Sequence, residues 1–281
     1  METKNTSHKV HRRLLPAALA VIGTPLVLFM AGVFVKGLAV REYRIESPKV
    51  REPFRLVLLS DLHSARFGEN QLELIEAVRD AEPDLIMITG DFFVEHLPYD
   101  AAIEAIKGVG VIAPCYFVAG NHEYRGHDIV NIKRLVRICG AEVLEGDCRE
   151  ALVKGNKVFV CGTDDAWIGN DAFNKQLDVL GSLEKDGYSI LLSHRSELVE
   201  VYRKLGFDLV LSGHAHGGHW RIPGLVNGLY APDQGWFPKY TGGVYTYENT
   251  AHVISRGLVN NNSIPRIYNP PEIVVVDICP A

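Results

Sequence analysis

The stretch GHAHGGH, at residues 213–219, places three histidines among three glycines directly after the apolar run DLVLS at 208–212. Glycine adopts backbone conformations that other residues avoid and lets other backbone approach closely, so the imidazoles can be turned toward one point. Imidazole is also the most common neutral metal ligand in proteins. The alternative interpretation is a histidine cluster in an exposed turn. A metal site requires further ligands from the rest of the chain, whereas an exposed turn does not.

Four other apolar runs of strand length also end in side chains that can bind a metal. They are FRLVLLS (54–60) before Asp61 and His63, DLIMITG (84–90) before Asp91, CYFVAG (115–120) before Asn121, His122 and Glu123, and YSILLS (188–193) before His194. Sites in open α/β sheets form at the carboxyl ends of strands. One such residue often only caps a helix. Five runs in the same phase predict a single site at one edge of a sheet.

The apolar runs alternate with segments of helical periodicity, which is typical of parallel βαβ units. The helical segments are 69–81, 99–108, 127–140, 171–184 and 196–205. Short strands joined by glycine turns are predicted at 142–163, and later strands around GGVYTYE (242–248), AHVISRG (251–257) and EIVVVDI (272–278). We therefore expect an α/β fold in which a two-layered β core is flanked by helices, within one catalytic domain at 54–281.

The chemistry of the strand-end residues favours two divalent metal ions. The candidate ligands supply carboxylate, amide oxygen and imidazole, and they are Asp61, His63, Asp91, Asn121, His194, His214 and His216. No thiolate belongs to the set, which favours Mn²⁺, Fe²⁺ or Zn²⁺ over a structural zinc site of the cysteine type. Seven ligands are too many for one tetrahedral ion. They suit two ions about 3.5–4 Å apart that share a carboxylate.

These motifs resemble the signature of the calcineurin-like metallophosphoesterases in order and spacing. The matching blocks are DLH (61–63), GD (90–91), GNHE (120–123), His194 and GHAH (213–216). The resemblance runs from about residue 54 to the C-terminus and implies a four-layer α/β/β/α sandwich. The segments GLYAPDQGWFPKYTGG (228–243), ISRGL (254–258) and NPPEI (269–273) are similar to a membrane-associated bacterial branch that resembles the phosphodiesterases YkuE and YaeI. That branch commonly has glutamine where this chain has His219.

The resemblance implies a role for each matching residue. One metal would be held by Asp61, His63 and His216, the other by Asn121, His194 and His214, with Asp91 bridging them. His122 would donate a proton to the leaving group, with Glu123 as its partner. A hydroxide between the two ions would attack phosphorus, because two cations lower the pKa of a bound water into the neutral range.

The N-terminal part of the chain differs in composition from the rest. Residues 1–13 form a short charged tail, 14–35 contain no charge, and 36–53 read as a charged linker. Twenty-two uncharged residues are long enough to cross about 30 Å of hydrocarbon. We therefore expect a single-pass anchor in the cell membrane. A cleaved signal peptide and a buried core helix are the alternatives. Lysine and arginine flank both sides of 14–35 about equally, so they predict no orientation.

Composition excludes some classes of function. With a formal net charge of −5 and no basic tract, the 281-residue chain carries no nucleic-acid signature. The five cysteines are widely spaced, odd in number and without a CxxC motif, so no disulfide framework is expected. Cys115 and Cys161 lie beside strand-like runs and are expected to be small buried apolar residues.

Three functions remain open, and the first is a phosphodiesterase acting on a lipid-linked phosphodiester or pyrophosphate. The resemblance implies UDP-2,3-diacylglucosamine as one such substrate. The second is a phosphodiesterase or nucleotidase of broad specificity for soluble esters, and the third is a non-catalytic scaffold on the same fold. Arg66 and Arg195 lie near ligand loops and are weaker candidates for phosphate binding. Trp236, Phe237 and Tyr240 are candidates for an apolar wall.

Overall fold

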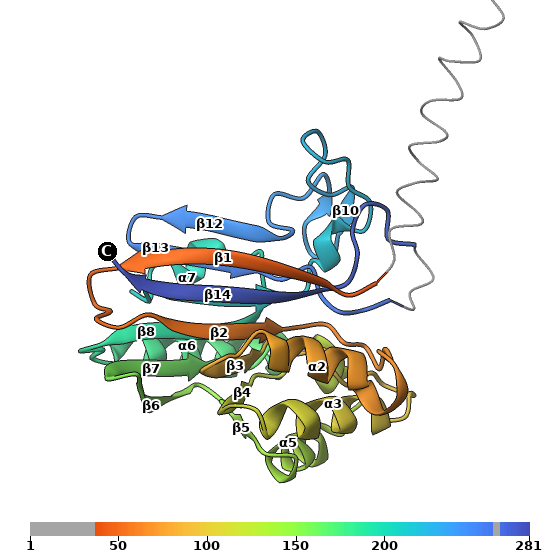
Figure 1. Cartoon of the computed structure of the whole chain (residues 1–281), viewed down its shortest axis with the longest axis horizontal. Coiled ribbons are helices and arrows are strands. Elements are labelled where there is room, and N and C mark those ends of the chain that lie inside the picture. The colour runs from red at the N-terminus through yellow and green to blue at the C-terminus, as the bar shows by residue number, and fades with distance from the viewer. Residues whose placement is uncertain (1–36, 261–264) are drawn as a thin grey trace, which may run out of the picture.

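The computed structural model describes residues 37–260 and 265–281 (Figure 1). The predicted tail at 1–13 and the predicted anchor at 14–35 lie outside these residues. Among the helices of the described part, none is both long enough and apolar enough to span a membrane.

Two six-stranded sheets form the centre of the molecule. The first has the order β1-β14-β2-β3-β4-β5, and its strands are Ala39–Ser47, Glu272–Pro280, Phe54–Leu59, Leu85–Ile88, Cys115–Phe117 and Ala141–Val143. The second has the order β12-β13-β9-β8-β7-β6, with Gly243–Tyr247, Thr250–Ile254, Leu209–Gly213, Tyr188–Arg195, Asn156–Gly162 and Asp147–Val153. Both sheets mix parallel and antiparallel pairs. A further short hairpin consists of β10 (Tyr230–Ala231) and β11 (Gly235–Trp236).

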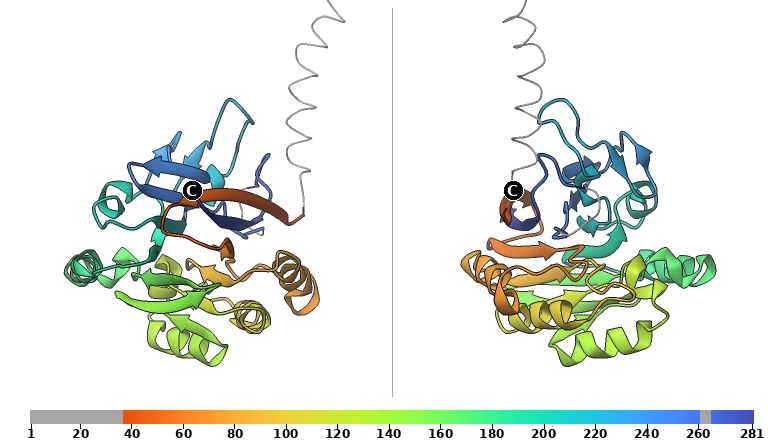
Figure 2. Two further views of the ribbon diagram at one scale, coloured as in Figure 1. Left: turned by 60° about the vertical axis from the view of Figure 1, so that its left-hand side comes forward. Right: turned by 90° about the vertical axis from the view of Figure 1, so that its right-hand side faces the viewer.

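The sheets pack face to face, and helices cover their outer faces (Figures 1 and 2). Leu56 and Leu58 of β2 point into the core between the sheets, together with Ile190 and Leu211 of the second sheet. The alternate residues Val57 and Leu59 pack on the helical side, because successive strand side chains point to opposite faces. Burial on both faces explains why these strands read as continuous apolar runs.

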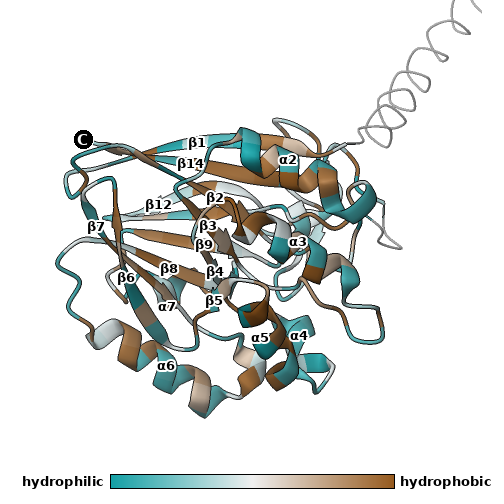
Figure 3. Ribbon diagram, turned by 60° about the horizontal axis from the view of Figure 1, so that its bottom comes forward, coloured by the Kyte–Doolittle hydropathy of each residue, from teal (hydrophilic) through white to brown (hydrophobic). Residues whose placement is uncertain are grey.

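The helices form two separate outer layers. The first sheet is covered by α2 (Leu72–Asp80), α3 (Asp100–Gly110) and α5 (Ile129–Ile138), whose apolar sides join its core. The second is covered by α6 (Asn170–Ser182) and α7 (Val199–Tyr202), where Leu180 and Tyr202 pack against Leu191 and Val210. Figure 3 shows the hydrophobic residues gathered along β2, β8 and β9. The predicted α/β core flanked by helices is therefore confirmed.

Two local predictions need correction. The segment 36–53, predicted as a linker, contains strand β1, which pairs with β14 over nine residues, from Ala39 opposite Glu272 to Ser47 opposite Pro280. Its charged side chains alternate along an edge strand, a pattern that resembles a solvated linker. The helix predicted at 196–205 is only the single turn α7.

The cysteine prediction is also corrected, because Cys148 and Cys161 form a disulfide. They stand opposite each other in the antiparallel pair β6–β7, so the strand register brings them together. An odd cysteine count is compatible with this pairing, since Cys115, Cys139 and Cys279 remain free and buried. The expectation that Cys115 is a small buried residue is confirmed.

Candidate metal centre

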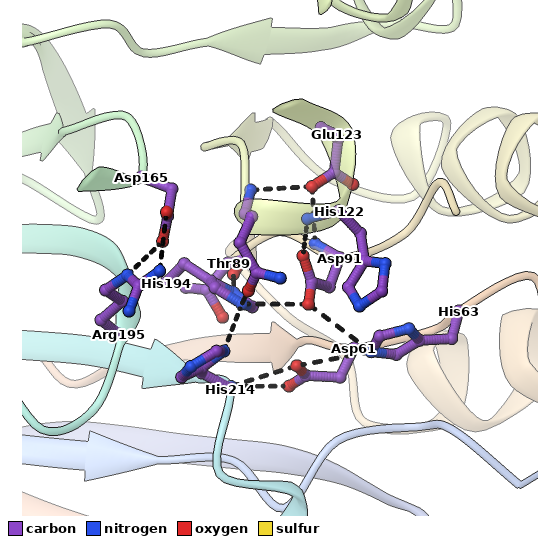
Figure 4. A network of polar contacts seen from close by, with 12 residues as sticks. Asp61, His63, Thr89, Asp91, His122, Glu123, Asp165, His194, Arg195 and His214 are labelled. Atoms are coloured by element: carbon purple, nitrogen blue, oxygen red, sulfur yellow. Dashed lines mark hydrogen bonds and ion pairs between the residues drawn. The ribbon is translucent and has the colours of Figure 1, made fainter. Parts of the chain in front are cut away.

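All seven predicted ligands come together at the carboxyl ends of five strands. Figure 4 labels Asp61, His63, Asp91, His194 and His214 among them. Asp61 and His63 follow β2, and Asp91 follows β3. Asn121 begins the short helix α4 (Asn121–Arg125) after β4, His194 lies near the end of β8, and His214 and His216 follow β9. All seven side chains are buried. The strands β2, β3 and β4 are parallel neighbours, as are β8 and β9, so their ends meet at one edge.

The first ligand cluster consists of Asp61, His63, Asp91 and His216, whose ligand atoms all lie within 4.8 Å of one another. Nε2 of His63 is 3.1 Å from Nε2 of His216. Oδ1 of Asp61 is 3.3 Å from the same His216 nitrogen, and Oδ2 of Asp91 is 3.6 Å from the His63 nitrogen. Burial lowers the pKa of His63 to about 3, so its ring is neutral and can act as a ligand.

The second cluster contains Asp91, His194 and His214, again within 4.8 Å of one another. Nε2 of His194 is 3.1 Å from Oδ2 of Asp91 and 3.0 Å from Nδ1 of His214. The amide oxygen of Asn121 lies 3.1 Å from the same His194 nitrogen. Asp91 therefore belongs to both clusters, and its carboxylate stands between them.

The hydrogen bonds of the outer ring nitrogens test whether this cluster fits a cation. Nδ1–H of His194 donates to the carbonyl of Thr89 at 2.7 Å, and Nε2–H of His214 donates to the carboxylate of Asp233 at 2.8 Å. Burial would lower the pKa of His194, but the neighbouring Asp91 raises it, so without a metal this ring keeps a second proton on Nε2. A bound cation would take the place of that proton, and the two nitrogens that face each other would then both offer lone pairs. Two lone pairs and two oxygens directed at one point fit a divalent cation, and the outer hydrogen bonds hold the rings in place.

The backbone at the site is unusual. Asp61, His63, Asp91, His214 and His216 all have positive φ, between 47° and 68°. Such conformations are uncommon for non-glycine residues and cluster at functional sites. Gly213 itself does not have positive φ. It is needed for space, because a Cβ there would collide with Ser60 and the Asp61 carboxylate. Gly217 and Gly218 do have positive φ, at 64° and 68°.

His122 lies beside the first cluster, but its partner is not the predicted one. Nδ1 of His122 is 2.7 Å from Oε2 of Glu95, and its ring stands edge to face with that of His63 at 4.7 Å. Nη1 of Arg125 is 3.2 Å from the other ring nitrogen, Nε2. The backbone N–H of His122 donates to Oδ1 of Asp91 at 2.9 Å, which ties the residue to the shared carboxylate.

Glu123, predicted as the partner of His122, has a structural role instead. Its buried carboxylate accepts backbone N–H bonds from Asp91, Phe92, Phe93 and Gly120, at 2.8–3.0 Å. It thereby joins the loop after β3 to the start of α4, the two segments that carry Asp91 and Asn121. Burial and the neighbouring Asp91 raise the pKa of Glu123 to about 7.

The weaker candidates take other positions. The guanidinium of Arg195 pairs with three carboxylates, those of Asp165, Glu197 and Asp233. Arg66 pairs with Glu104. These arginines are therefore engaged within the protein rather than directed at the clusters. His219 is buried beside His216, with ring centroids 5.6 Å apart.

Asp233 was not predicted from the sequence. It lies in the turn between β10 and β11, where its carboxylate accepts from His214 and from Arg195, at 2.8 and 2.7 Å. The hydrogen bond from His214 lowers the pKa of Asp233 to about 2. No spacing or motif marks this residue, since an aspartate in a Gly/Pro-rich turn usually serves the turn itself.

Two clusters of carboxylate and imidazole that share one aspartate, at the strand ends of a helix-flanked double sheet, define the class of metal-dependent phosphoesterases. The family model for calcineurin-like phosphoesterases matches residues 54–218, and the chain belongs to this family.

Several bacterial proteins are similar over most of their length. An uncharacterized metallophosphoesterase of Aquifex aeolicus is 30% identical, with 86% of this chain and 92% of that protein aligned. The metallophosphoesterase YkuE of Bacillus subtilis is 28% identical over 83% of both chains. The phosphodiesterase YaeI of Escherichia coli is 27% identical over 80% of this chain and 82% of its own. The predicted resemblance to YkuE and YaeI is thus confirmed.

Proposed function

We propose that this phosphoesterase hydrolyses phosphodiesters with two divalent metal ions, one in each ligand cluster. The observation that carries the proposal is the position of Asp91, whose carboxylate belongs to both clusters. Donors of this kind suit Mn²⁺, Fe²⁺ or Zn²⁺. When bound, such ions neutralise phosphoryl oxygens and lower the pKa of water, which supplies a nucleophile at neutral pH.

The side chains of the protein provide positioning and proton transfer. The seven ligands hold both ions at the strand ends, and Glu123 fixes the two loops that carry Asp91 and Asn121. His122 is the proton donor to the leaving group, through Nε2, once that nitrogen is released from the N–H of Arg125, which lies 3.2 Å from it in the structure. Glu95 accepts from Nδ1–H and so orients the ring. Because no serine or cysteine is needed as nucleophile, the reaction proceeds without a covalent enzyme intermediate.

For the substrate, a lipid-linked phosphodiester or pyrophosphate such as UDP-2,3-diacylglucosamine is the leading candidate. The charge-free run at 14–35 supports it, because an anchored enzyme works close to the bilayer. A broad phosphodiesterase or nucleotidase for soluble esters is the second candidate. A non-catalytic scaffold is disfavoured, since all seven ligands and His122 are present and assembled.

For the location, we propose a single-pass N-terminal anchor in the cell membrane. We place the catalytic domain on the side of the membrane that faces an oxidising compartment. The support for the side is the Cys148–Cys161 disulfide, since such bonds persist outside the reducing cytosol.

The experiment that tests the function combines metal analysis with a substrate panel. We expect two metal ions per chain, loss of activity on chelation and recovery with Mn²⁺. We also expect faster hydrolysis of bis-p-nitrophenyl phosphate than of p-nitrophenyl phosphate. Asp91→Asn should lower the activity more than replacement of any one histidine ligand, because each histidine belongs to only one of the two clusters. Full activity of a metal-free preparation would contradict the proposal.

His122→Ala separates proton donation from metal binding. Its metal content should stay at the wild-type level, while turnover falls about 10²–10⁴-fold. The loss should be smaller for p-nitrophenolate than for a poor leaving group, because a good leaving group needs less protonation. If the metal content falls along with the activity, His122 is a ligand and not the proton donor.

A further inference from the structure

The most exposed apolar side chains near the metal centre lie on two neighbouring turns between residues 222 and 237. Leu225 is 80% exposed, in a tight turn that hydrogen bonds of Leu225 and Val226 to the carbonyl of Ile222 close. Trp236 and Phe237 are 69% and 70% exposed, at the end of the β10–β11 hairpin. Exposed apolar groups gathered in this way usually mark an interaction site.

Hydrogen bonds and close backbone packing connect the two turns to the candidate metal centre. The N–H of Leu229 donates to the carbonyl of Gly218 at 2.9 Å, and a Cβ on Gly218 would lie only 2.5 Å from Cα of Gly228. Asp233, in the second turn, accepts from the candidate ligand His214. The GHAHGGH segment thus carries both the candidate ligands and the base of the exposed turns.

Backbone strain points to the same place. Phe237 has a φ of 54°, a conformation that bulky residues rarely adopt, while its ring gains little from burial. Its N–H donates to the carbonyl of Leu229, and the neighbouring Trp236 ring stands edge to face with that of Tyr230 at 5.6 Å. The hairpin therefore holds the Phe237 side chain outward.

We infer that these two turns dock on a lipid bilayer, with the side chains of Leu225, Trp236 and Phe237 entering its interfacial region. Aromatic and aliphatic residues on short turns suit this region, where rings lie among the headgroups. The only charged residues from 220 to 240 are Arg221, Asp233 and Lys239, and Asp233 is already paired with Arg195. With two basic residues and one aspartate, the segment itself carries a small positive excess, which favours anionic lipids.

The connection to the N-terminus favours a bilayer over other occupants. The described chain starts at Gly37, which only Lys36 separates from the charge-free run at 14–35. Ala39 donates to the carbonyl of Pro271, four residues from Ile267, which pairs with Trp220 at the base of the first turn. Figure 1 shows β10 and the start of β1 at the same end of the molecule. An anchored chain would thus present these turns, and the metal centre behind them, to the same membrane.

This inference extends the proposed function, because a docked site would act on phosphodiesters whose lipid part stays in the bilayer.

Docking on a bilayer can be tested in the full-length protein through its three tryptophans, Trp167, Trp220 and Trp236. With Trp167→Phe and Trp220→Phe, Trp236 becomes the only reporter. The protein is placed in vesicles of phosphatidylcholine and phosphatidylglycerol that are brominated near the headgroup. The emission of Trp236 should shift to the blue and be quenched by bromine. The W220F/W236F protein keeps only Trp167 and serves as the control, and the quenching of Trp236 should be at least about twofold stronger than that of Trp167. Equal quenching of both reporters, or none, overturns the inference.

A kinetic test uses a matched pair of exposed leucines. Leu152, on the edge strand β6, is 81% exposed and serves as control for Leu225. The measured quantity is the rate on hexadecyl p-nitrophenyl phosphate in vesicles divided by the rate on soluble bis-p-nitrophenyl phosphate. Leu225→Ser should lower this ratio about fivefold, whereas Leu152→Ser should leave it unchanged. Equal ratios in the two variants contradict docking.

Two further outcomes are separable. If the wild-type protein hydrolyses neither ester, the proposed function fails, while the quenching result still decides the docking. If sedimentation velocity shows a dimer that Leu225→Ser dissociates, the turns belong to an interface with a second copy, and the bilayer assignment is wrong.

Discussion

Glu95 is the residue on which the proposed proton donation by His122 would depend. Although its partial burial would raise the pKa of Glu95, the hydrogen bond from His122 lowers it, so the carboxylate stays charged beside Nδ1–H. Glu95→Gln keeps the shape but removes the charge. We expect turnover with a poor leaving group to fall about 10–100-fold at unchanged metal content.

The control for this variant is Glu104→Gln, which removes only the surface pair with Arg66. The loss in Glu95→Gln should shrink with p-nitrophenolate as leaving group, as it does for His122→Ala. A uniform loss with all leaving groups would instead mean that Glu95 serves only to hold the loop.

The roles of Glu95 and Glu123 also show where sequence reasoning ends at this scale. Glu123 adjoins His122 in the sequence, and the resemblance implied that it is the partner. In the structure, consecutive residues of α4 point in different directions, so the Glu123 carboxylate reaches backbone N–H groups after β3. Glu95 lies in that same loop after β3, 27 residues before His122, and no spacing in the sequence marks it.

His252 makes stability depend on pH through burial alone. It lies on β13, where Nε2 contacts Oγ of Ser212 at 3.0 Å, and full burial lowers its pKa to about 3. Since the unfolded chain has an ordinary histidine pKa near 6.5, it binds more protons than the folded protein below that pH. This contribution to stability is therefore complete above about pH 6.5 and is lost as the pH falls toward 3.

His252→Gln should remove this dependence. Between pH 7 and pH 5, the free energy of unfolding of the variant should fall by about 2 kcal/mol less than that of the wild type. Urea unfolding with a chelator present in both samples measures the difference. His96→Gln supplies the control, because it makes the same side-chain change at an exposed position. Parallel curves for the His252 variant and the wild type would refute this assignment.

At the scale of elements, the accuracy of the predictions follows burial. The strands β2, β3, β8 and β9 are buried on both faces, so their apolar runs are visible in the sequence. In β1, Arg41, Glu42, Arg44 and Glu46 alternate at an exposed edge, and the hydrogen bonds to β14 leave no apolar signature. The exact bounds of α7 depended on packing that periodicity cannot show.

Strand β1 determines how far the chain can be shortened from its N-terminal end. It covers β14, whose opposite side pairs with β2, the strand that leads to Asp61. A chain beginning at Gly37 keeps this pairing and should unfold at nearly the temperature of a full-length reference in detergent. A chain beginning at Arg51 exposes the apolar β14 as an edge strand and should aggregate or melt at least about 5 °C lower. Equal melting temperatures of the two shortened chains would mean that β1 contributes little.

At the scale of the whole molecule, the candidate metal centre depends on the packing of both sheets. The first sheet and its loops supply Asp61, His63, Asp91 and Asn121, and the second supplies His194, His214 and His216. Each cluster takes residues from both sheets. The sequence predicted this ligand set because each ligand stands at the end of a strand. It could not predict Asp233, which reaches His214 only through the fold of an irregular loop.

The disulfide determines how many free thiols the whole protein contains. Three of the five cysteines are free, and all three are buried. Protein purified without reductant and denatured with a thiol reagent present should therefore react at three thiols, and at five after reduction. Cys148→Ala supplies the control. It frees Cys161, so the unreduced count should rise to four and should not increase on reduction. Five thiols in unreduced wild-type protein would show that Cys148 and Cys161 are not paired. The domain would then have no need of an oxidising compartment, and the proposed side of the membrane would lose its support.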